Sequence, residues 1–312
     1  MNIKFWGSCM LNCLYNGKRI NALSIENEDY EYRKEIKLAG TNKQLICEDC
    51  NTPMVFKICT QRISHFAHWK NMSIDCTYND YSTSETEEHR QCKMILYKYF
   101  KRLYPDALVE TEYKVLPNRR SDIFVMFNDK SKLVLDIQRR DLSVSKWENK
   151  HKDYKNAGIT DIWLIAGIPF GEKEKNMPFF QQVAINESID RIALFFDYST
   201  EKITLMKKMI FVDKTGKEYS DLYTKEYHLK DIKILPNGKI ESDFHFFFES
   251  AENLFCSRWI GKIEEEERQR QINLNTNADK QLIIENVFPK IIKNVEWDDL
   301  DESNSDLYIV VA

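Results

Sequence analysis

The hydrophobic pattern is most regular shortly before the middle of the chain. Apolar and aromatic residues recur at helical spacing from Cys92 to Leu103, which predicts an amphipathic helix. Ser84, with Glu87 three positions later, has the spacing of a capping box, so this helix is expected to begin near Ser84. It should end before Pro105, because proline disrupts a helix interior.

Three short segments rich in β-branched and aromatic residues follow this helix, namely residues 109–115, 120–127 and 132–138. Residues 128–131 have the composition of a turn, so the last two segments should form a hairpin. A second helix is predicted from Ser145 to about Gly158, and the apolar run 161–166 is typical of a strand buried on both faces. The predicted order is helix, three strands, helix, strand.

The chain divides into three expected parts, residues 1–80, 81–170 and 171–312. In the first part, Asn16-Gly17 between apolar flanks predicts a β-hairpin. The third part is strand-rich, then helical over about 249–272, and ends in an acidic tail of unknown function. The pattern as a whole indicates an α/β protein of the α+β type.

Composition excludes several classes of protein. With 43% hydrophobic residues and only 9 glycines, the chain is neither disordered nor collagen-like. A net charge of −4 argues against a simple polycationic coat for nucleic acid. Residues 85–160 nevertheless carry 16 lysines and arginines against 12 acids, which leaves room for a local basic groove.

The sequence predicts a cytoplasmic protein that does not interact with a membrane. No apolar run approaches the roughly 20 residues that span a bilayer, and the N-terminus lacks a basic leader and a cleavage site. Cytoplasmic cysteines stay reduced, so the 8 cysteines require an explanation other than disulfides.

A cluster of cysteines and histidines supplies that explanation. Cys47 and Cys50 form a Cys-x2-Cys knuckle, which presents two thiolates on one tight turn. The further candidate ligands are His65, His68 and Cys76, with Cys59 as a weaker one. Without Cys59 there are five candidates, and four of them would form a tetrahedral structural zinc site. One sequence does not say which of the two histidines faces the metal. The alternative is that they are buried small side chains, but their density favours zinc.

Two aspartates lie within predicted strands, where an acid is costly to bury unless it is paired or bound to a metal. If the hairpin closes through residues 128–131, Asp122 and Asp136 lie opposite each other within one residue of register. Two carboxylates that converge in this way can bind a divalent cation. The alternative is that each pairs with a neighbouring arginine among Arg119, Arg120, Arg139 and Arg140.

The first helix adds further polar candidates at helical spacing: Glu85, Glu88, His89 and Lys93. Glu85 or Glu88 is a candidate third acid of the site. The natural contacts to a phosphate backbone include Arg119, Arg120, Arg139, Arg140 and Lys146.

These motifs, together with Tyr154 and Ile162-Trp163-Leu164, resemble the CoiA-like competence protein family over about residues 10–170. The resemblance implies a zinc-finger-like N-terminal region and a restriction-endonuclease-like domain of the PD-(D/E)xK type, in the order αβββαβ. It also implies a link to DNA uptake and recombination in bacterial transformation. Carried over, Asp122 matches the metal-binding Asp, Asp136 the second acid, and Glu85 or Glu88 the helix acid.

The chain departs from the family pattern at two positions. The second acid is usually Glu, and here it is the shorter Asp136; Gln138 stands where the wider fold has Lys. Glutamine can orient water but carries no charge. Lys150 or Lys146, on the following helix, could supply the missing charge.

The sequence thus predicts a Mg²⁺- or Mn²⁺-dependent nuclease that acts on DNA. Asp122, Asp136 and Glu85 or Glu88 would hold the metal, and Gln138 and Lys150 would position water or stabilise the developing charge. The main alternative is a catalytically inactive DNA-binding accessory protein that keeps the fold; a third is a protein-interacting adaptor with salt-bridged acids. Recombination or defence proteins are possible partners.

Overall fold

The computed structural model places the described residues in three β-sheets and several helices. The described residues are 9–25, 28–60, 62–69, 76, 78, 86–138, 142–166 and 192–293. They belong to two units. The first extends to residue 210 and includes 220–251, whereas the second contains 211–219 and continues from 252.

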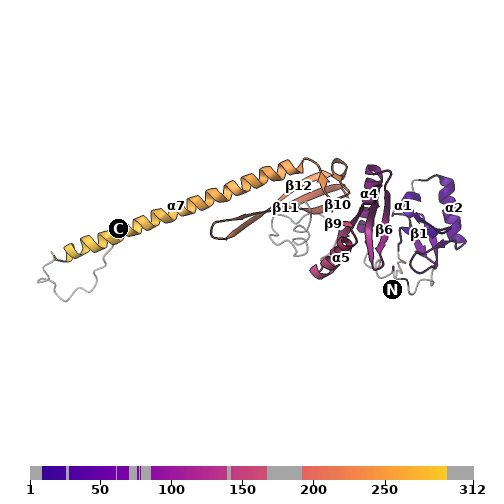
Figure 1. Cartoon of the computed structure of the whole chain (residues 1–312), viewed down its shortest axis with the longest axis horizontal. Coiled ribbons are helices and arrows are strands. Elements are labelled where there is room, and N and C mark those ends of the chain that lie inside the picture. The colour runs from indigo at the N-terminus through magenta and orange to yellow at the C-terminus, as the bar shows by residue number, and fades with distance from the viewer. Residues whose placement is uncertain are drawn as a thin grey trace. The chain divides into compact units, whose positions relative to one another are not determined.

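The N-terminal sheet, which is marked by the label β1 in Figure 1, has five short strands. Their order in the sheet is β2-β1-β3-β4-β5. The strands are β1 (Asn12–Tyr15), β2 (Lys18–Asn21), β3 (Leu45–Ile46), β4 (Pro53–Lys57) and β5 (His65–His68). Between β2 and β3 the chain forms helices α1 (Ala22–Ile25) and α2 (Tyr30–Thr41). Asn16 and Gly17 turn the β1–β2 hairpin with φ of 51° and 73°, as the Asn-Gly pair predicts.

Helix α2 approaches β4 closely at Gly40. A Cβ atom there would lie 3.1 Å from the Phe56 backbone nitrogen and 3.2 Å from the Val55 Cα. We therefore expect Gly40→Ala to destabilise the fold by about 1–3 kcal/mol, measured by denaturant unfolding, because backbone has to move. Gly261→Ala, in the helix α7 (Phe244–Lys293) and with open space around it, should instead stabilise by up to about 1 kcal/mol. Stabilisation by both variants would contradict this packing.

The larger sheet has seven strands in the order β12-β11-β10-β9-β8-β7-β6. The strands are β6 (Leu108–Leu116), β7 (Arg119–Met126), β8 (Lys132–Gln138), β9 (Thr160–Ala166), β10 (Ala193–Asp197), β11 (Lys202–Val212) and β12 (Glu218–His228). Strands β6, β7 and β8 are antiparallel neighbours, whereas β9 is parallel to both β8 and β10. Strands from both sides of the boundary expected at residue 170 therefore share one sheet.

Two helices accompany this sheet, α4 (Glu87–Leu103) before β6 and α5 (Val144–Asn156) between β8 and β9. The predicted order of helix, three strands, helix and strand is thus confirmed. The observed N-cap of α4 is Thr86, whose hydroxyl accepts a hydrogen bond from the His89 backbone nitrogen (3.3 Å), so the predicted start at Ser84 is two residues early. Gly158 follows α5 with φ of 66°, as expected at a helix C-terminus.

The core beside the site is apolar. Tyr154 of α5 packs with Phe124, Val134 and Ile159. The interior of β8 is buried, as is typical of a central strand flanked by neighbours on both sides. Asp136 is therefore held in a largely apolar setting, where its charge needs partners.

The remaining elements are η1 (Leu229–Asp231), β13 (Lys233–Ile234), β14 (Ile240–Glu241) and α7. The helix predicted over 249–272 lies within α7, which is longer at both ends. Among the described helices, none combines the length and apolar character that crossing a membrane requires. The acidic tail expected at the C-terminus lies outside the described residues.

Candidate functional site: a cysteine–histidine cluster and an aspartate pair

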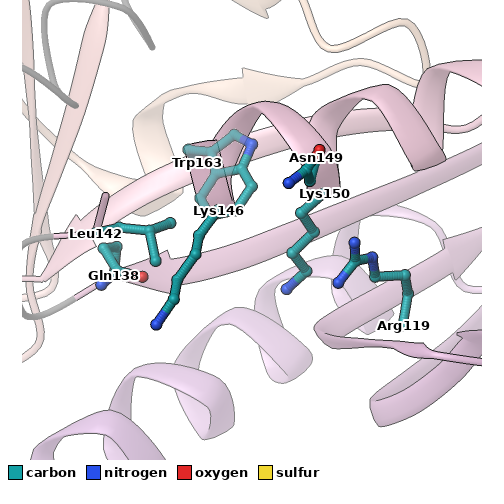
Figure 2. Close-up of a pocket in the computed structure, with 7 residues that line it drawn as sticks. All are labelled: Arg119, Gln138, Leu142, Lys146, Asn149, Lys150 and Trp163. Carbon is teal, nitrogen blue, oxygen red and sulfur yellow. The ribbon is translucent and has the colours of Figure 1, made fainter. Parts of the chain in front are cut away.

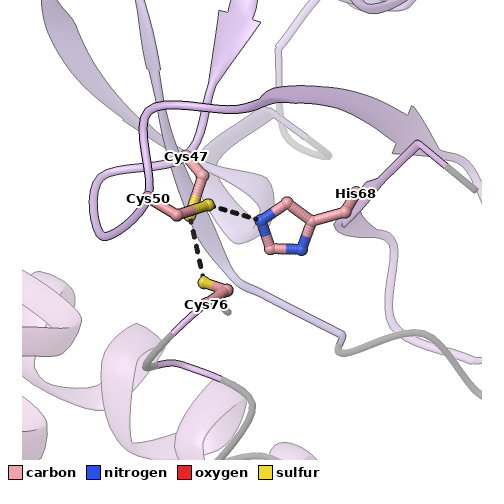
Figure 3. Close-up of side chains that lie close together, drawn as sticks. All are labelled: Cys47, Cys50, His68 and Cys76. Atoms are coloured by element: carbon pink, nitrogen blue, oxygen red, sulfur yellow. Dashed lines mark hydrogen bonds between the residues drawn. The ribbon is translucent and has the colours of Figure 1, made fainter. Parts of the chain in front are cut away.

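Four side chains of the N-terminal part converge on one point: Cys47, Cys50, His68 and Cys76 (Figure 3). Their ligand atoms all lie within 4.8 Å of one another. The sulfurs of Cys47 and Cys76 are 3.8 Å apart, which is about the edge of a tetrahedron with zinc–sulfur bonds of about 2.3 Å. The Cys50 sulfur lies 3.2 Å from Nε2 of His68. This donor set fits a structural zinc ion.

The turn between β3 and β4 positions the knuckle. The Cys47 backbone nitrogen donates to the Thr52 carbonyl (2.9 Å), and the Asn51 nitrogen donates to the Cys47 carbonyl (3.0 Å). Burial raises the pKa of the Cys47 and Cys76 thiols above the ordinary value. Buried thiolates without a cation would therefore be unfavourable, and a bound metal ion would stabilise them.

The structure distinguishes the two candidate histidines. His68, at the end of β5, points at the cysteines, whereas Nδ1 of His65 lies 3.1 Å from the Ile63 carbonyl and 3.9 Å from the Cys59 sulfur. Burial lowers the pKa of His68, which favours the neutral imidazole that binds metals. Of the five expected residues, the structure thus brings together the three cysteines and His68 as the candidate ligands.

The two predicted aspartates meet across β7 and β8. The pairing of Ile123 with Leu135 sets Asp122 opposite Asp136, as the turn predicts. The Asp122 backbone nitrogen lies 3.4 Å from Oδ1 of Asp136, and the Ile137 backbone nitrogen donates to Oδ2 of Asp122 (2.8 Å). Each carboxylate is therefore fixed by the backbone of the neighbouring strand.

Two helices bring basic side chains to these carboxylates. Nε2 of His89 and Nζ of Lys93, both on α4, lie 3.1 Å and 4.0 Å from Oδ1 of Asp122. Nζ of Lys150, on α5, lies 2.8 Å from Oδ2 of Asp136. Burial would raise the pKa of Asp122, but His89, Lys93 and Lys150 hold it below the ordinary value.

The pKa of the Asp136 carboxyl shifts in the opposite direction. Its burial and the neighbouring charge of Asp122 raise the pKa of its carboxyl, although Lys150 opposes the shift. Opposed shifts in two adjacent carboxyls are typical of functional sites, where one group is kept ionised and its neighbour is harder to ionise.

A cavity of about 380 Å³ reaches Lys150, the ion-pair partner of Asp136 (Figure 2). It is lined by Arg119, Gln138, Leu142, Lys146, Asn149, Lys150 and Trp163. Lys146 and Lys150 lie one turn apart on α5, and Lys150 also contacts Asp136. The lining holds three cationic side chains and no acid, so the cavity suits an anionic group such as a phosphate.

Two arginines contact the knuckle, Arg120 from β7 and Arg19 from β2. Arg120 donates to both carboxylate oxygens of Asp49 (2.7 and 2.8 Å), and Nε of Arg19 lies 3.1 Å from Glu48. Arg120, which the sequence predicts as a DNA contact, joins the knuckle to β7 and is not among the residues that line the cavity. Arg119, for its part, pairs with Asp153 (2.6 Å) while it lines the cavity.

Comparison with known families identifies the chain. Residues 85–235 match the family model described as the nuclease-like domain of competence protein CoiA, and residues 29–79 match its N-terminal domain. The chain belongs to the CoiA-like competence protein family. These two matches confirm the resemblance to the CoiA-like family that the sequence motifs indicate. No curated protein and no solved structure matches the chain.

In this CoiA-like chain, the structure shows which described residues of α4 lie beside the aspartates. Glu85 lies outside the described residues, as do Arg139 and Arg140. Glu88 accepts a hydrogen bond from the Thr86 hydroxyl (3.4 Å) at the N-terminus of α4. His89 and Lys93, which share its helix face by sequence spacing, are the α4 residues that form ion pairs with Asp122.

Sequence reasoning missed Glu112 altogether. It is buried on β6 and its Oε1 lies 2.6 Å from Nζ of Lys93. The criterion that singled out Asp122 and Asp136, an acid within a predicted strand, applies equally to Glu112 and would have found it.

The aspartate pair fits a hard divalent cation. Mg²⁺ is commonly bound by one or two carboxylates, with water and substrate oxygens as the other ligands. Among the described residues, only the Cys47 cluster brings three or more His, Cys, Asp or Glu ligands together. A cation at Asp122 and Asp136 would therefore depend on water and phosphate oxygens for the rest of its coordination.

Proposed function

We propose that the chain hydrolyses phosphodiester bonds of DNA with Mg²⁺ or Mn²⁺ bound at Asp122 and Asp136. The observation that carries this proposal is the convergence of the two carboxylates beside a cavity whose charged lining is entirely cationic. The nuclease-like family match covers both aspartates and supports the same activity.

Each residue has a definite role in the proposed reaction. The metal ion, when bound, would lower the pKa of a water molecule and offset charge on the phosphate. Lys150, fixed beside Asp136, places a positive charge where negative charge develops, and the Gln138 amide orients water. Arg119 and Lys146 bind the phosphate backbone from the cavity wall.

The zinc-bound module braces the N-terminal sheet and holds β7 through Arg120. We place the protein in the cytoplasm, where it would act with recombination or defence proteins. The family description ties this work to competence.

A second candidate function is a DNA-binding accessory protein without turnover. The ion pair of Lys150 with Asp136 favours it, as does the contact of His89 with Asp122, because Lys150 and a protonated His89 would compensate the charge that a metal would neutralise. The cationic cavity serves DNA binding equally well in both candidates.

Cleavage assays separate the two. Single-stranded, duplex and branched DNA are incubated with the zinc-loaded protein and Mg²⁺, Mn²⁺ or EDTA. Metal-dependent cleavage of at least one substrate is expected. Binding of DNA without cleavage under every condition would establish the accessory role. Absence of both DNA binding and cleavage would favour the protein-interacting adaptor.

The cavity makes a separate prediction about DNA affinity. Lys146→Ala should weaken binding of all sequences alike and reduce the slope of log K against log salt by about 0.9 for duplex or about 0.7 for single strands, since one phosphate contact is lost. Fluorescence anisotropy titrations over a range of salt concentrations measure both effects. Lys98→Ala, an exposed lysine of α4 outside the cavity lining, is the matched control and should change neither.

A further inference from the structure

A buried ion pair lies behind the aspartates. Nζ of Lys93 and Oε1 of Glu112 are 2.6 Å apart, and both side chains are at most 4% exposed. The other oxygen of Glu112 accepts a hydrogen bond from the Leu11 backbone nitrogen (3.1 Å). Burial would raise the pKa of Glu112, but Lys93 and hydrogen bonds from Tyr78 and Leu11 hold it below the ordinary value, so this carboxylate is ionised.

The pair is aligned with Asp122. The β6–β7 pairs Thr111–Ile123 and Tyr113–Ser121 flank Glu112 and Asp122, which sets these two acids opposite each other. Nζ of Lys93 lies 4.0 Å from Oδ1 of Asp122. One ammonium group therefore lies close to two carboxylates, Glu112 on one strand and Asp122 on the next.

This arrangement is costly for the fold. Glu112 has φ of 49°, in the left-handed region that a non-glycine residue in a strand seldom adopts. Burial of two charges often costs as much as their attraction returns, so an ion pair of this kind is weak support for stability. Strain and buried charge beside a candidate site point to a role in the site.

The charges of the pair act on Asp122 in opposite senses. Lys93 repels a cation that approaches Asp122, whereas Glu112 compensates Lys93 and holds its ammonium group in place. The local charge at Asp122 thus depends on both members. We propose that the Lys93–Glu112 pair tunes the divalent-cation affinity of the aspartate site, with Glu112 a positioning residue that acts through Lys93.

This inference rests on the proposed function, because it needs a cation at the aspartates. The test measures Mn²⁺ binding to the full-length, zinc-loaded protein by electron paramagnetic resonance. The Asp122→Asn/Asp136→Asn variant supplies the background. If the native protein binds no more Mn²⁺ than this variant, the proposed metal site itself is wrong.

The two single variants should shift Mn²⁺ affinity in opposite directions. Glu112→Gln keeps the shape and the acceptor for Leu11 but removes the negative charge that lies 2.6 Å from Nζ of Lys93, so binding should weaken on the order of tenfold. Lys93→Met removes the repelling charge, so binding should tighten on the order of tenfold. The charge-neutral Lys93→Met/Glu112→Gln variant should return to within about threefold of the native value.

Shifts of Mn²⁺ affinity in opposite directions would distinguish a tuning role of the pair from a purely structural one. If the pair served only to stabilise the fold, both single variants would lose Mn²⁺ affinity together with thermal stability. Weakening in both, or no change in either, would overturn the proposal. Should Lys93→Met not fold, Glu112→Gln still decides, since native zinc content and unchanged Mn²⁺ affinity would contradict it.

Discussion

Replacing Asp122 by asparagine is expected to lower metal-dependent DNA cleavage by about 10³-fold or more. A bound cation contributes several kcal/mol of transition-state stabilisation, and about 4 kcal/mol corresponds to a factor of about 10³. Asparagine keeps an oxygen to accept from the Ile137 backbone nitrogen, so the β7–β8 hairpin should remain intact. Cleavage rates at saturating Mg²⁺, together with thermal melts of both proteins, test the expectation.

Asp129→Asn provides the matched control, because it removes one negative charge from the same hairpin. Asp129 lies in the exposed turn, where it accepts hydrogen bonds from the Ser131 backbone nitrogen and hydroxyl (2.9 and 2.6 Å). Its replacement should leave cleavage unchanged. Equal cleavage by the Asp122 and Asp129 variants would place any hydrolysis elsewhere in the chain.

Local patterns were sufficient to predict the core. The pattern of hydrophobic residues in the strands and the helical spacing from Cys92 to Leu103 depend only on residues that are close in sequence. The structure has these helices and strands in the predicted order. The turn at residues 128–131 also set the register, because side chains alternate with a period of two. Asp122 and Asp136 were therefore brought together by a purely local argument.

The partners of the aspartates could not be derived in that way. Arginines near in sequence were the expected alternative, but Arg120 is held by Asp49, 71 positions away. His89 and Lys150 come instead from helices whose placement on the sheet depends on tertiary packing. The Lys93–Glu112 pair likewise joins a helix to a strand, and no periodicity indicates such a contact.

The choice of histidine shows the same limit. Residues three apart on a strand point to opposite faces, so His65 and His68 cannot both face the cysteines. If residues 65–68 form a strand, the sequence therefore implies that only one of the two histidines can bind the metal. Which one is excluded follows only from the pairing of β5 with β4, which turns His68 toward the knuckle.

The second prediction with a large expected effect concerns the cysteine–histidine cluster. Cys47→Ala should abolish stoichiometric zinc and unfold the N-terminal sheet, since structural zinc contributes on the order of 10 kcal/mol, comparable with the whole stability of a domain. Inductively coupled plasma mass spectrometry and thermal melts measure the two effects. Cys59→Ser is the matched control, because Cys59 lies outside the four-residue cluster and its loss should change neither.

The effect should extend to the aspartates. Glu48 and Asp49 lie between the first two cysteines, so a knuckle without metal releases Arg19 and Arg120. Arg120 donates to the Glu112 carbonyl (2.6 Å) and lies two residues before Asp122 on β7. DNA cleavage should therefore fall together with zinc content in Cys47→Ala, although Cys47 is not part of the reacting site. A zinc-free protein that melts and cleaves like the native one would contradict the structural role of the metal and the bracing role of Arg120.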